Sequence, residues 1–331
     1  MQRNDMLEYL GGLDKNDRYP LWIISYNRAG KAPFLNTIHK NWERKDDIHV
    51  VVRDSQRASY KRAYPEFFVL SLPDNEIDAV GKARWGAVQL AQGLGEPVIS
   101  MFDDDVLALR FLFLRHFMRG ANVGKPCSGH STLEDEAVLP DLGERVVGGF
   151  HDVARTVIAD NPDVVIGGMI KQHMSFDVKN HQLRYILNGG VTPRQAMVWH
   201  IERMAEKQIE LNLDHFGLHG DDIGIVVQAL ANGGDSFAVP SFAYEHWPES
   251  INIKESVVRN AGNKQQLHEI EWAALQEYPA KDYLRVKRSI IDGSYEWGDI
   301  NWVACAKKRG RPTVRVPWAQ DAAEYLSAEL L

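Results

Sequence analysis

Short apolar runs and amphipathic segments alternate along the first third of the chain. Four short runs rich in branched and aromatic side chains predict strands: Leu21–Ser25, Ile48–Val52, Phe67–Leu72 and Val98–Phe102. Two segments with apolar residues at helical spacing lie between them, at 33–41 and 77–92. Strands that alternate with helices predict an α/β protein with a parallel sheet flanked by helices.

The later pattern is less regular. The segment 106–117 is apolar almost all round and predicts a buried helix, whereas 121–141 is rich in Gly, Ser, Pro and acidic residues and predicts a loop. Further on we expect these elements: a helix at 150–159, a strand at 163–167, a glycine-rich turn at 187–191, a helix from about 221, a strand at 237–239 and a loop at 243–248.

Composition is that of an ordinary globular protein. The chain has 331 residues, of which 44% are hydrophobic and 25% charged. Its two cysteines, Cys127 and Cys305, lack the spacing of a zinc site or a disulfide framework. No apolar run approaches membrane-spanning length and the N-terminus lacks a signal pattern, so we expect a cytoplasmic location (the host cytoplasm if the source is a phage) and no membrane contact. The net charge of −7 argues against a wholly basic nucleic-acid coat.

The strongest chemical signal is three consecutive carboxylates directly after the fourth predicted strand. Because side chains alternate along a strand, Asp103 and Asp105 should project to one side and Asp104 to the other. Ligands of open α/β sheets bind at the carboxyl ends of the strands. Two carboxylates there suit a hard divalent cation that keeps open positions for phosphate oxygens. A solvated acidic turn could have the same sequence and remains the alternative.

Four cues in order carry a family resemblance. They are a first strand ending in YNR, a second strand ending in Asp54, a helix reading ARWGA and the strand reading VISMFDDD. Together they resemble the nucleotide-binding half of a GT-A glycosyltransferase, closely over about 20–110 and more loosely over 185–250. The resemblance implies a Rossmann-like sheet, a sugar-nucleotide donor such as a UDP-sugar, and Mn²⁺ or Mg²⁺. The helix departs from the family at Trp85, where Asn is commoner.

The resemblance also assigns residues to the donor site. Asp54 would accept hydrogen bonds from the base, Arg84 would reach the nucleotide, and Asp105 would hold the metal with Asp103 near the ribose or the metal. The remaining donor-site residues that it implies are Tyr26, Asn27, Arg28 and Asp104. A late histidine completes the metal site in many such enzymes, and His246 is the matching position. Solvated or turn residues remain the alternative for Asp54 and Arg84.

A second acidic stretch, GDDIG, opens an amphipathic helix at Asp221. Carboxylates in a first turn can serve simply as helix caps. In the resembling family, however, an acidic pair here ends in the catalytic base of inverting enzymes. Asp222 is the matching position, where it would deprotonate the acceptor hydroxyl.

The tail carries a basic signal. The stretch KKRGRP matches the core of an AT-hook, in which arginines enter the narrow minor groove, and its candidate DNA contacts are Lys308, Arg309 and Arg311. Over 281–315 there are nine Lys or Arg against four Asp or Glu, which is the charge pattern of a nucleic-acid footprint. A chance basic loop would look the same.

A glycosyltransferase with a DNA-binding tail resembles the transferases associated with TET/JBP-type oxygenases, including the base J glucosyltransferase and its bacteriophage relatives. That resemblance implies transfer of a sugar, such as glucose from UDP-glucose, to the hydroxymethyl group of a modified pyrimidine in DNA. We expect a transferase domain over 1–250 and a mixed α/β C-terminal extension over 251–331. The alternatives are a transferase acting on a polysaccharide, lipid or protein, and a non-catalytic DNA-binding module on a decayed transferase fold.

Overall fold

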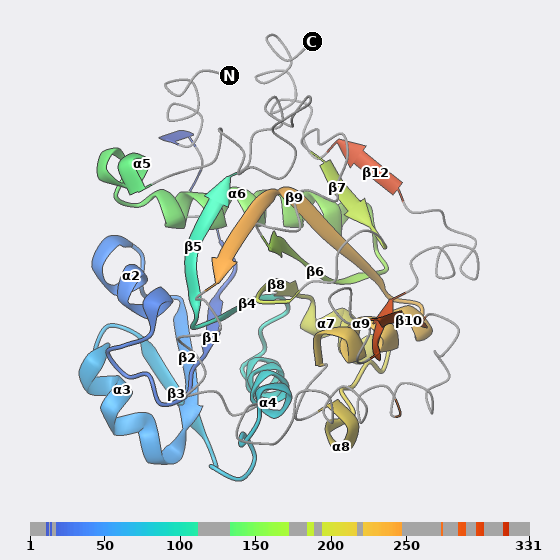
Figure 1. Cartoon of the computed structure of the whole chain (residues 1–331), viewed down its shortest axis with the longest axis horizontal. Helices are drawn as coiled ribbons and strands as arrows, with labels where there is room; N and C mark the ends of the chain where they lie inside the picture. The colour runs from blue at the N-terminus through green and yellow to red at the C-terminus, as the bar shows by residue number, and fades with distance from the viewer. Residues whose placement is uncertain are drawn as a thin grey trace.

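The computed structural model describes residues 11–12, 14, 18–111, 133–171, 184–188, 194–216, 221–246, 273, 284–288, 296–300 and 314–317. Within them a ten-stranded sheet runs in the order β12-β7-β9-β6-β8-β4-β1-β2-β3, and β5 pairs with β9 beside this path. Helices lie on both faces of the sheet (Figure 1). The expected α/β class is therefore confirmed.

The first part of the chain builds the parallel block of the sheet. Its elements are β1 (Leu21–Ile24), α2 (Pro33–Asn41), β2 (Ile48–Arg53), the short 3-10 helix η1 (Asp54–Gln56), α3 (Arg57–Ala63), β3 (Phe68–Leu72), α4 (Val80–Gly93) and β4 (Ile99–Asp103). Strand β1 pairs in parallel with β2 and β4, and β2 pairs in parallel with β3. The carboxyl ends of all four strands therefore lie along one edge of the sheet, and the aspartates at the end of β4 lie at this edge.

The second part of the chain extends the sheet with mixed pairing. Its elements are β5 (Val106–Phe111), α5 (Leu133–Val138), α6 (Leu142–Asp160), β6 (Val164–Lys171), β7 (Arg184–Leu187), β8 (Ala196–Trp199), α7 (Ile201–Glu206), α8 (Leu213–Phe216), α9 (Asp221–Ala231) and β9 (Asp235–His246). Strand β8 runs antiparallel to both β4 and β6, while β6 and β9 are parallel. Because β8 lies directly beside β4, residues that precede β8 come close to the end of β4.

Three short strands follow in the C-terminal region. Strands β10 (Leu284–Arg288) and β11 (Glu296–Ile300) form an antiparallel pair of their own. Strand β12 (Val314–Pro317) instead joins the main sheet by antiparallel pairing with β7. The predicted C-terminal extension therefore contributes an edge strand to the main sheet.

Several helix and strand predictions were wrong. Residues 106–111, predicted as the start of a buried helix, form strand β5, which pairs antiparallel with β9; the rest of that segment lies outside the described residues. The side chains of Val106, Leu109 and Phe111 are buried while Leu107 is 44% exposed, so burial follows a strand rather than a helix. The partner strand β9 continues to His246, through most of the predicted loop at 243–248.

The remaining helices also differ from expectation. The predicted loop at 121–141 contains helix α5 where it is described, and α6 is longer than the predicted 150–159 segment at both ends. Helix α4 begins at Val80 rather than at Ile77. By contrast, α2 spans the predicted residues, with Pro33 at its start and His39 and Lys40 in its last turn.

Two hydrophobic layers sandwich the sheet. One contains α2 and α6 and includes Phe34, Phe102 and Phe150; the other contains α4, α7 and α9. Glycine permits close packing at Gly86 of α4, where a Cβ atom would lie 2.5 Å from Leu72 Cδ1. Helix α4 is thereby held close to β3, beside the edge where the strands end.

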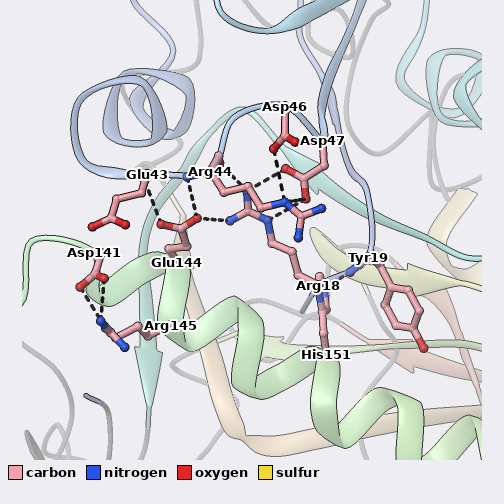
Figure 2. Close-up of polar contacts among 10 residues, drawn as sticks. All are labelled: Arg18, Tyr19, Glu43, Arg44, Asp46, Asp47, Asp141, Glu144, Arg145 and His151. Atoms are coloured by element: carbon pink, nitrogen blue, oxygen red, sulfur yellow. Dashed lines mark hydrogen bonds and ion pairs between the residues drawn. The ribbon is translucent and has the colours of Figure 1, made fainter. Parts of the chain in front are cut away.

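A buried polar network ties the segment before β1 to α6 (Figure 2). The Arg18 guanidinium donates to Asp47 Oδ1 and Oδ2 at 2.8 and 2.9 Å and to Glu144 Oε1 at 2.6 Å. It also lies 4.9 Å from the centre of the Trp42 ring. The Arg18 and Glu144 side chains are 0% exposed, so their charges are compensated entirely within the protein.

Candidate active site

A pocket of about 190 Å³ lies at the carboxyl ends of the parallel strands. Its walls come from the ends of β1 and β2, from the start of α4 and from the aspartate triplet after β4. The apolar part of the lining consists of Ile24, Val51, Ile77, Ala79, Val80 and Ala83. An apolar slot with carboxylates and arginines at its mouth can hold a planar base and leave phosphate groups among the charges.

The middle aspartate of the triplet faces away from its neighbours. Asp104 Oδ1 lies 2.5 Å from Arg28 Nη1, and the Ser25 hydroxyl donates to its other oxygen. Tyr60 completes the group, because its hydroxyl accepts from the Arg28 amide at 2.9 Å and lies 2.6 Å from Ser25 Oγ. Burial raises the pKa of Asp104 to about 7, and Arg28 opposes that shift. Asp104 therefore anchors the loop that follows β1.

Asp103 and Asp105 share a neighbour, as the alternation along the strand predicts. Gln195 hydrogen-bonds Asp103, and its Nε2 donates to Asp105 Oδ1 at 3.3 Å. Asp103 also receives Arg84 Nη2, which lies 2.9 and 2.7 Å from its two oxygens. The two carboxylates thus lie on one side of the chain, and Arg84 and Gln195 hold the first of them.

Arg84 extends from α4 and contacts both acidic motifs. Its Nη1 donates to Asp221 in the first turn of α9, while its Nη2 holds Asp103. All three side chains are largely buried, with exposed fractions of 7%, 6% and 13% for Arg84, Asp221 and Asp103. Burial lowers the pKa of the guanidinium, but the two carboxylates outweigh it and hold that pKa well above its usual value. The predicted contact of Arg84 with a nucleotide stays a prediction.

Asp222 is held by a different arginine. Arg194 Nε lies 3.1 Å from Asp222 Oδ2, and Asp222 Oδ1 accepts from the Ile223 amide at 3.0 Å. The Asp222 side chain is 18% exposed, so it keeps access to solvent. Burial raises the pKa of the Tyr244 hydroxyl; the charge of Arg194 opposes this rise, and the charges of Asp103 and Asp222 add to it.

Sequence reasoning missed Arg194, Gln195 and Tyr244. The first two come directly before β8, a strand of four residues that was not predicted. The apolar run Ala196–Trp199 was the available signal, because an antiparallel strand beside β4 would begin where β4 ends. Tyr244 belongs to the part of β9 that was predicted as a loop.

The predicted base-binding residues separate into two groups. Tyr26 and Arg28 line the pocket. Asn27, at φ 55°, instead bonds to Gln56, whose Nε2 donates to Asn27 Oδ1 at 2.6 Å. Asp54 is exposed at the start of η1, while the pocket lining includes the preceding residue, Arg53, whose guanidinium lies 4.2 Å from the Tyr26 ring centre. The role of Asp54 in base recognition stays a prediction.

The predicted metal ligands come from neighbouring strands. His246 is the cross-strand partner of Val106, the residue after Asp105, and its Nε2 lies 2.6 Å from Lys171 Nζ. Among the described residues, no three His, Cys, Asp or Glu side chains are grouped closely enough to hold a metal. Because Arg84 contacts both oxygens of Asp103, the donor chemistry best fits a cation held by Asp105 together with phosphate and water oxygens.

The predicted DNA contacts Lys308, Arg309 and Arg311 lie outside the described residues. No helix in the described parts of the chain has the length and apolar character to cross a membrane.

An α/β sheet with an acidic pocket at the ends of its parallel strands is the architecture of enzymes that bind nucleotides or other phosphorylated ligands. The family model described as TET-Associated Glycosyltransferase matches residues 19–134, which run from just before β1 past β5. The resemblance derived from the motifs is therefore confirmed over this stretch, and it supports a glycosyltransferase. No match was found among curated proteins.

Two solved structures show a distant likeness. The crystal structure of GalNAc-T7 with UDP, GalNAc and Mn²⁺ is 11% identical, has a TM-score of 0.43, and the match covers 95% of this chain and 58% of that chain. The crystal structure of mannose-1-phosphate geranyltransferase from Thermus thermophilus is also 11% identical, with a TM-score of 0.34 and coverage of 67% and 73%. The chain thus spans little more than half the length of the first of these proteins.

Proposed function

We propose that the protein is a metal-dependent inverting glycosyltransferase that moves a sugar, glucose from UDP-glucose, onto the hydroxymethyl group of a modified pyrimidine in DNA. The observation that carries the proposal is that Arg84 joins the acidic motif lining the pocket to a second acidic motif at the start of α9. Asp103 and Asp105 lie at the end of β4, and Asp221 and Asp222 open α9 from more than a hundred residues further along the chain. Arg84 contacts one member of each motif.

The pocket supplies the elements that a sugar nucleotide needs. The base would occupy the apolar slot beside Tyr26, and the diphosphate would lie toward Arg28 and Asp105 at the mouth. The residues that would hold Mn²⁺ or Mg²⁺ are Asp105, with Asp103 and His246 as the further predicted ligands. When bound, such a cation stabilises the negative charge of the departing diphosphate.

Asp222 would act as the general base. The hydroxymethyl oxygen of the acceptor attacks the anomeric carbon as its proton passes to an Asp222 oxygen, and the bond from that carbon to the diphosphate breaks to release UDP. Each carboxylate oxygen has two lone pairs, so the contacts with Arg194 and the Ile223 amide leave acceptor capacity for that proton. A single displacement from the face opposite the diphosphate converts an α-linked donor into a β-linked product.

Two observations support DNA as the acceptor. One is the matching family, described as TET-Associated Glycosyltransferase. The other is the basic AT-hook-like stretch KKRGRP in the tail, on a chain whose net charge is −7. A hydroxymethyl group on a paired base is hard to reach, so such an acceptor would be extruded from the duplex.

The Asp222→Asn variant tests the proposal. The change removes the proton acceptor but keeps its shape, so turnover should fall by about 10²–10⁴-fold while UDP-glucose binding in Mn²⁺ is nearly unchanged. Transfer would be measured by mass spectrometry of nucleosides after hydroxymethylated DNA is incubated with UDP-glucose, and binding by titration calorimetry.

Asp221→Asn is not a suitable control here, because Asp221 belongs to the same charged network. An exposed acid far from the pocket, Asp160→Asn at the end of α6, should keep full turnover. Wild-type turnover by Asp222→Asn would overturn the assignment of the base. Transfer to a glycan, lipid or protein but never to DNA would overturn the acceptor.

A further inference from the structure

Two buried arginines in this protein each bridge a pair of carboxylates from distant parts of the chain. Arg18 joins Asp47 and Glu144 beneath α6 (Figure 2). Arg84 joins Asp103 and Asp221. The two bridges differ in their surroundings. Asp103 lines the pocket, whereas Arg18, Asp47 and Glu144 do not.

The Arg84 bridge spans the two halves of the proposed site. Asp103 is the last residue of β4, in the donor half, and Asp221 is the first residue of α9, in the acceptor half. Arg84 extends from α4, which packs against β1 and also contacts α9. One side chain therefore connects the strand that carries the metal-binding motif with the helix that carries the proposed base.

The chemistry of the bridge needs an arginine. The planar guanidinium presents several donors in a fixed fork, so one group can serve two carboxylates in different directions. A lysine ammonium is a compact point charge on a flexible stem and does not reproduce that fork. Burial raises the pKa of both carboxyl groups, and the charge of Arg84 opposes that rise at each of them.

We propose that Arg84 is a positioning residue that couples the donor and acceptor halves of the site, holding the first turn of α9 so that Asp222 keeps its place beside the pocket. This inference rests on the proposed function. Asp222 is the next residue after Asp221, so a change in how Asp221 is held moves the base directly. The donor-side contacts of Asp104 and Arg28 do not involve Arg84, so donor binding depends less on the bridge.

The test removes the acceptor end of the bridge. Asp221→Ala leaves Arg84 paired with Asp103, so no buried carboxylate loses its partner. We expect kcat for transfer from UDP-glucose to hydroxymethylated DNA to fall by about 10–100-fold, the usual effect of losing a group that orients another, while the Kd for UDP changes by less than about threefold.

Arg84→Lys provides a second variant that keeps the charge. Because lysine cannot reproduce the fork, kcat should fall as in Asp221→Ala, again with little change in the Kd for UDP. The split between kcat and donor affinity distinguishes a positioning role from a general loss of folded protein.

Glu144→Ala is the matched control. It removes one of two carboxylates from an equally buried arginine, Arg18, outside the pocket. Its thermal melting temperature should fall at least as much as that of Asp221→Ala, because Glu144 also accepts from the Glu43 and Arg44 amides, but its kcat, corrected for the folded fraction, should stay within about twofold of wild type.

The outcomes separate this inference from the function on which it rests. Full transfer activity in Asp221→Ala, or equal losses of kcat in Asp221→Ala and Glu144→Ala, would overturn the coupling role while leaving the transferase intact. A wild-type protein that neither hydrolyses UDP-glucose nor transfers from it would instead overturn the proposed function. Loss of donor affinity in parallel with kcat would place Arg84 in donor binding and also contradict the inference.

Discussion

The three aspartates of the triplet after β4 have different sets of partners, although Asp103 and Asp105 share Gln195. Asp103 is held by Arg84, and Asp104 is held by Arg28 and Ser25. Asp105 accepts a 3.3 Å hydrogen bond from the neutral Gln195 amide. This contact with a neutral amide differs in kind from the charge-assisted bonds that hold Asp103 and Asp104. Three adjacent, chemically identical side chains thus acquire separate roles.

The three roles predict different effects of Asn substitution. Asp105→Asn should weaken Mn²⁺ binding in the presence of UDP at least about tenfold, because a charged oxygen ligand is lost. Asp104→Asn should leave Mn²⁺ affinity near wild type but lower the free energy of unfolding by about 1–3 kcal/mol, since the buried charge-assisted bond to Arg28 is lost. Mn²⁺ titration followed by electron paramagnetic resonance, together with urea unfolding, would measure both.

The result that contradicts this assignment is the reverse one. If Asp104→Asn abolished Mn²⁺ binding while Asp105→Asn retained it, the metal would have to lie on the Arg28 side of the triplet.

At the scale of elements, the sequence pattern predicted correctly those helices and strands that are determined by their own residues. The segment 33–41 was predicted as the opening of a helix, and helix α2 spans it with Pro33 at its start. Strand β5 could not be predicted in this way, because an all-round apolar segment suits a buried helix or a strand equally well. Pairing with β9 decides it, through contacts such as Arg110 with Glu245, 135 residues away. Non-local pairing of this kind leaves no local signature.

The same limit applies to the candidate site. The aspartates and the start of α9 stand next to recognisable motifs, so they were found from the sequence. Their pairing with Arg84 was not predicted, because Asp103 and Asp221 lie 19 and 137 residues from Arg84 and only the folded protein brings them together. Gln195 and Arg194 were not identified because β8, the strand that follows them, is too short to show a clear alternation of apolar and polar residues.

Packing between β6 and β9 gives a prediction at this scale. Gly167 lies opposite Phe237, and a Cβ atom at Gly167 would be 1.9 Å from the ring. Gly167→Ala should therefore lower the free energy of unfolding by about 1–3 kcal/mol, as measured by urea denaturation. Phe237→Leu in the same chain should recover part of that loss, because it removes the atoms that clash.

Gly93→Ala is the control, since a Cβ atom there meets no atom within 4 Å. Its stability should stay within about 0.5 kcal/mol of wild type. Equal effects at Gly93 and Gly167 would show that chain entropy, rather than the Phe237 contact, determines the cost.

Across the whole molecule, buried polar groups connect the segment before β1 with helix α6 and with strands β4 and β8 of the sheet. The Tyr19 amide donates to His151 Nδ1 at 3.1 Å, so Nε2 carries the proton and donates to Ser100 Oγ at 2.8 Å. Ser100 in turn donates to the Met197 carbonyl of β8 at 3.2 Å. This chain of bonds requires a neutral imidazole, which makes the stability of the protein depend on pH.

Burial of His151, reinforced by the positive charges of Arg155 and Arg18, holds its pKa well below the usual 6.5. Below that value the unfolded chain binds a proton that the folded protein does not, so stability falls as the pH is lowered. Between pH 7.5 and 5.5 this one group should cost about 1.4 kcal/mol of unfolding free energy. Urea denaturation at pH 7.5 and at pH 5.5 should therefore show a fall in unfolding free energy between them. We expect this fall to be about 1.4 kcal/mol smaller in His151→Gln than in the wild type. Other titrating groups, including Asp104, are common to both proteins and cancel in the difference. Equal drops in the two proteins, with unchanged denaturant slopes, would mean that His151 binds its proton in the folded state and that the bond to the Tyr19 amide does not enforce the neutral ring.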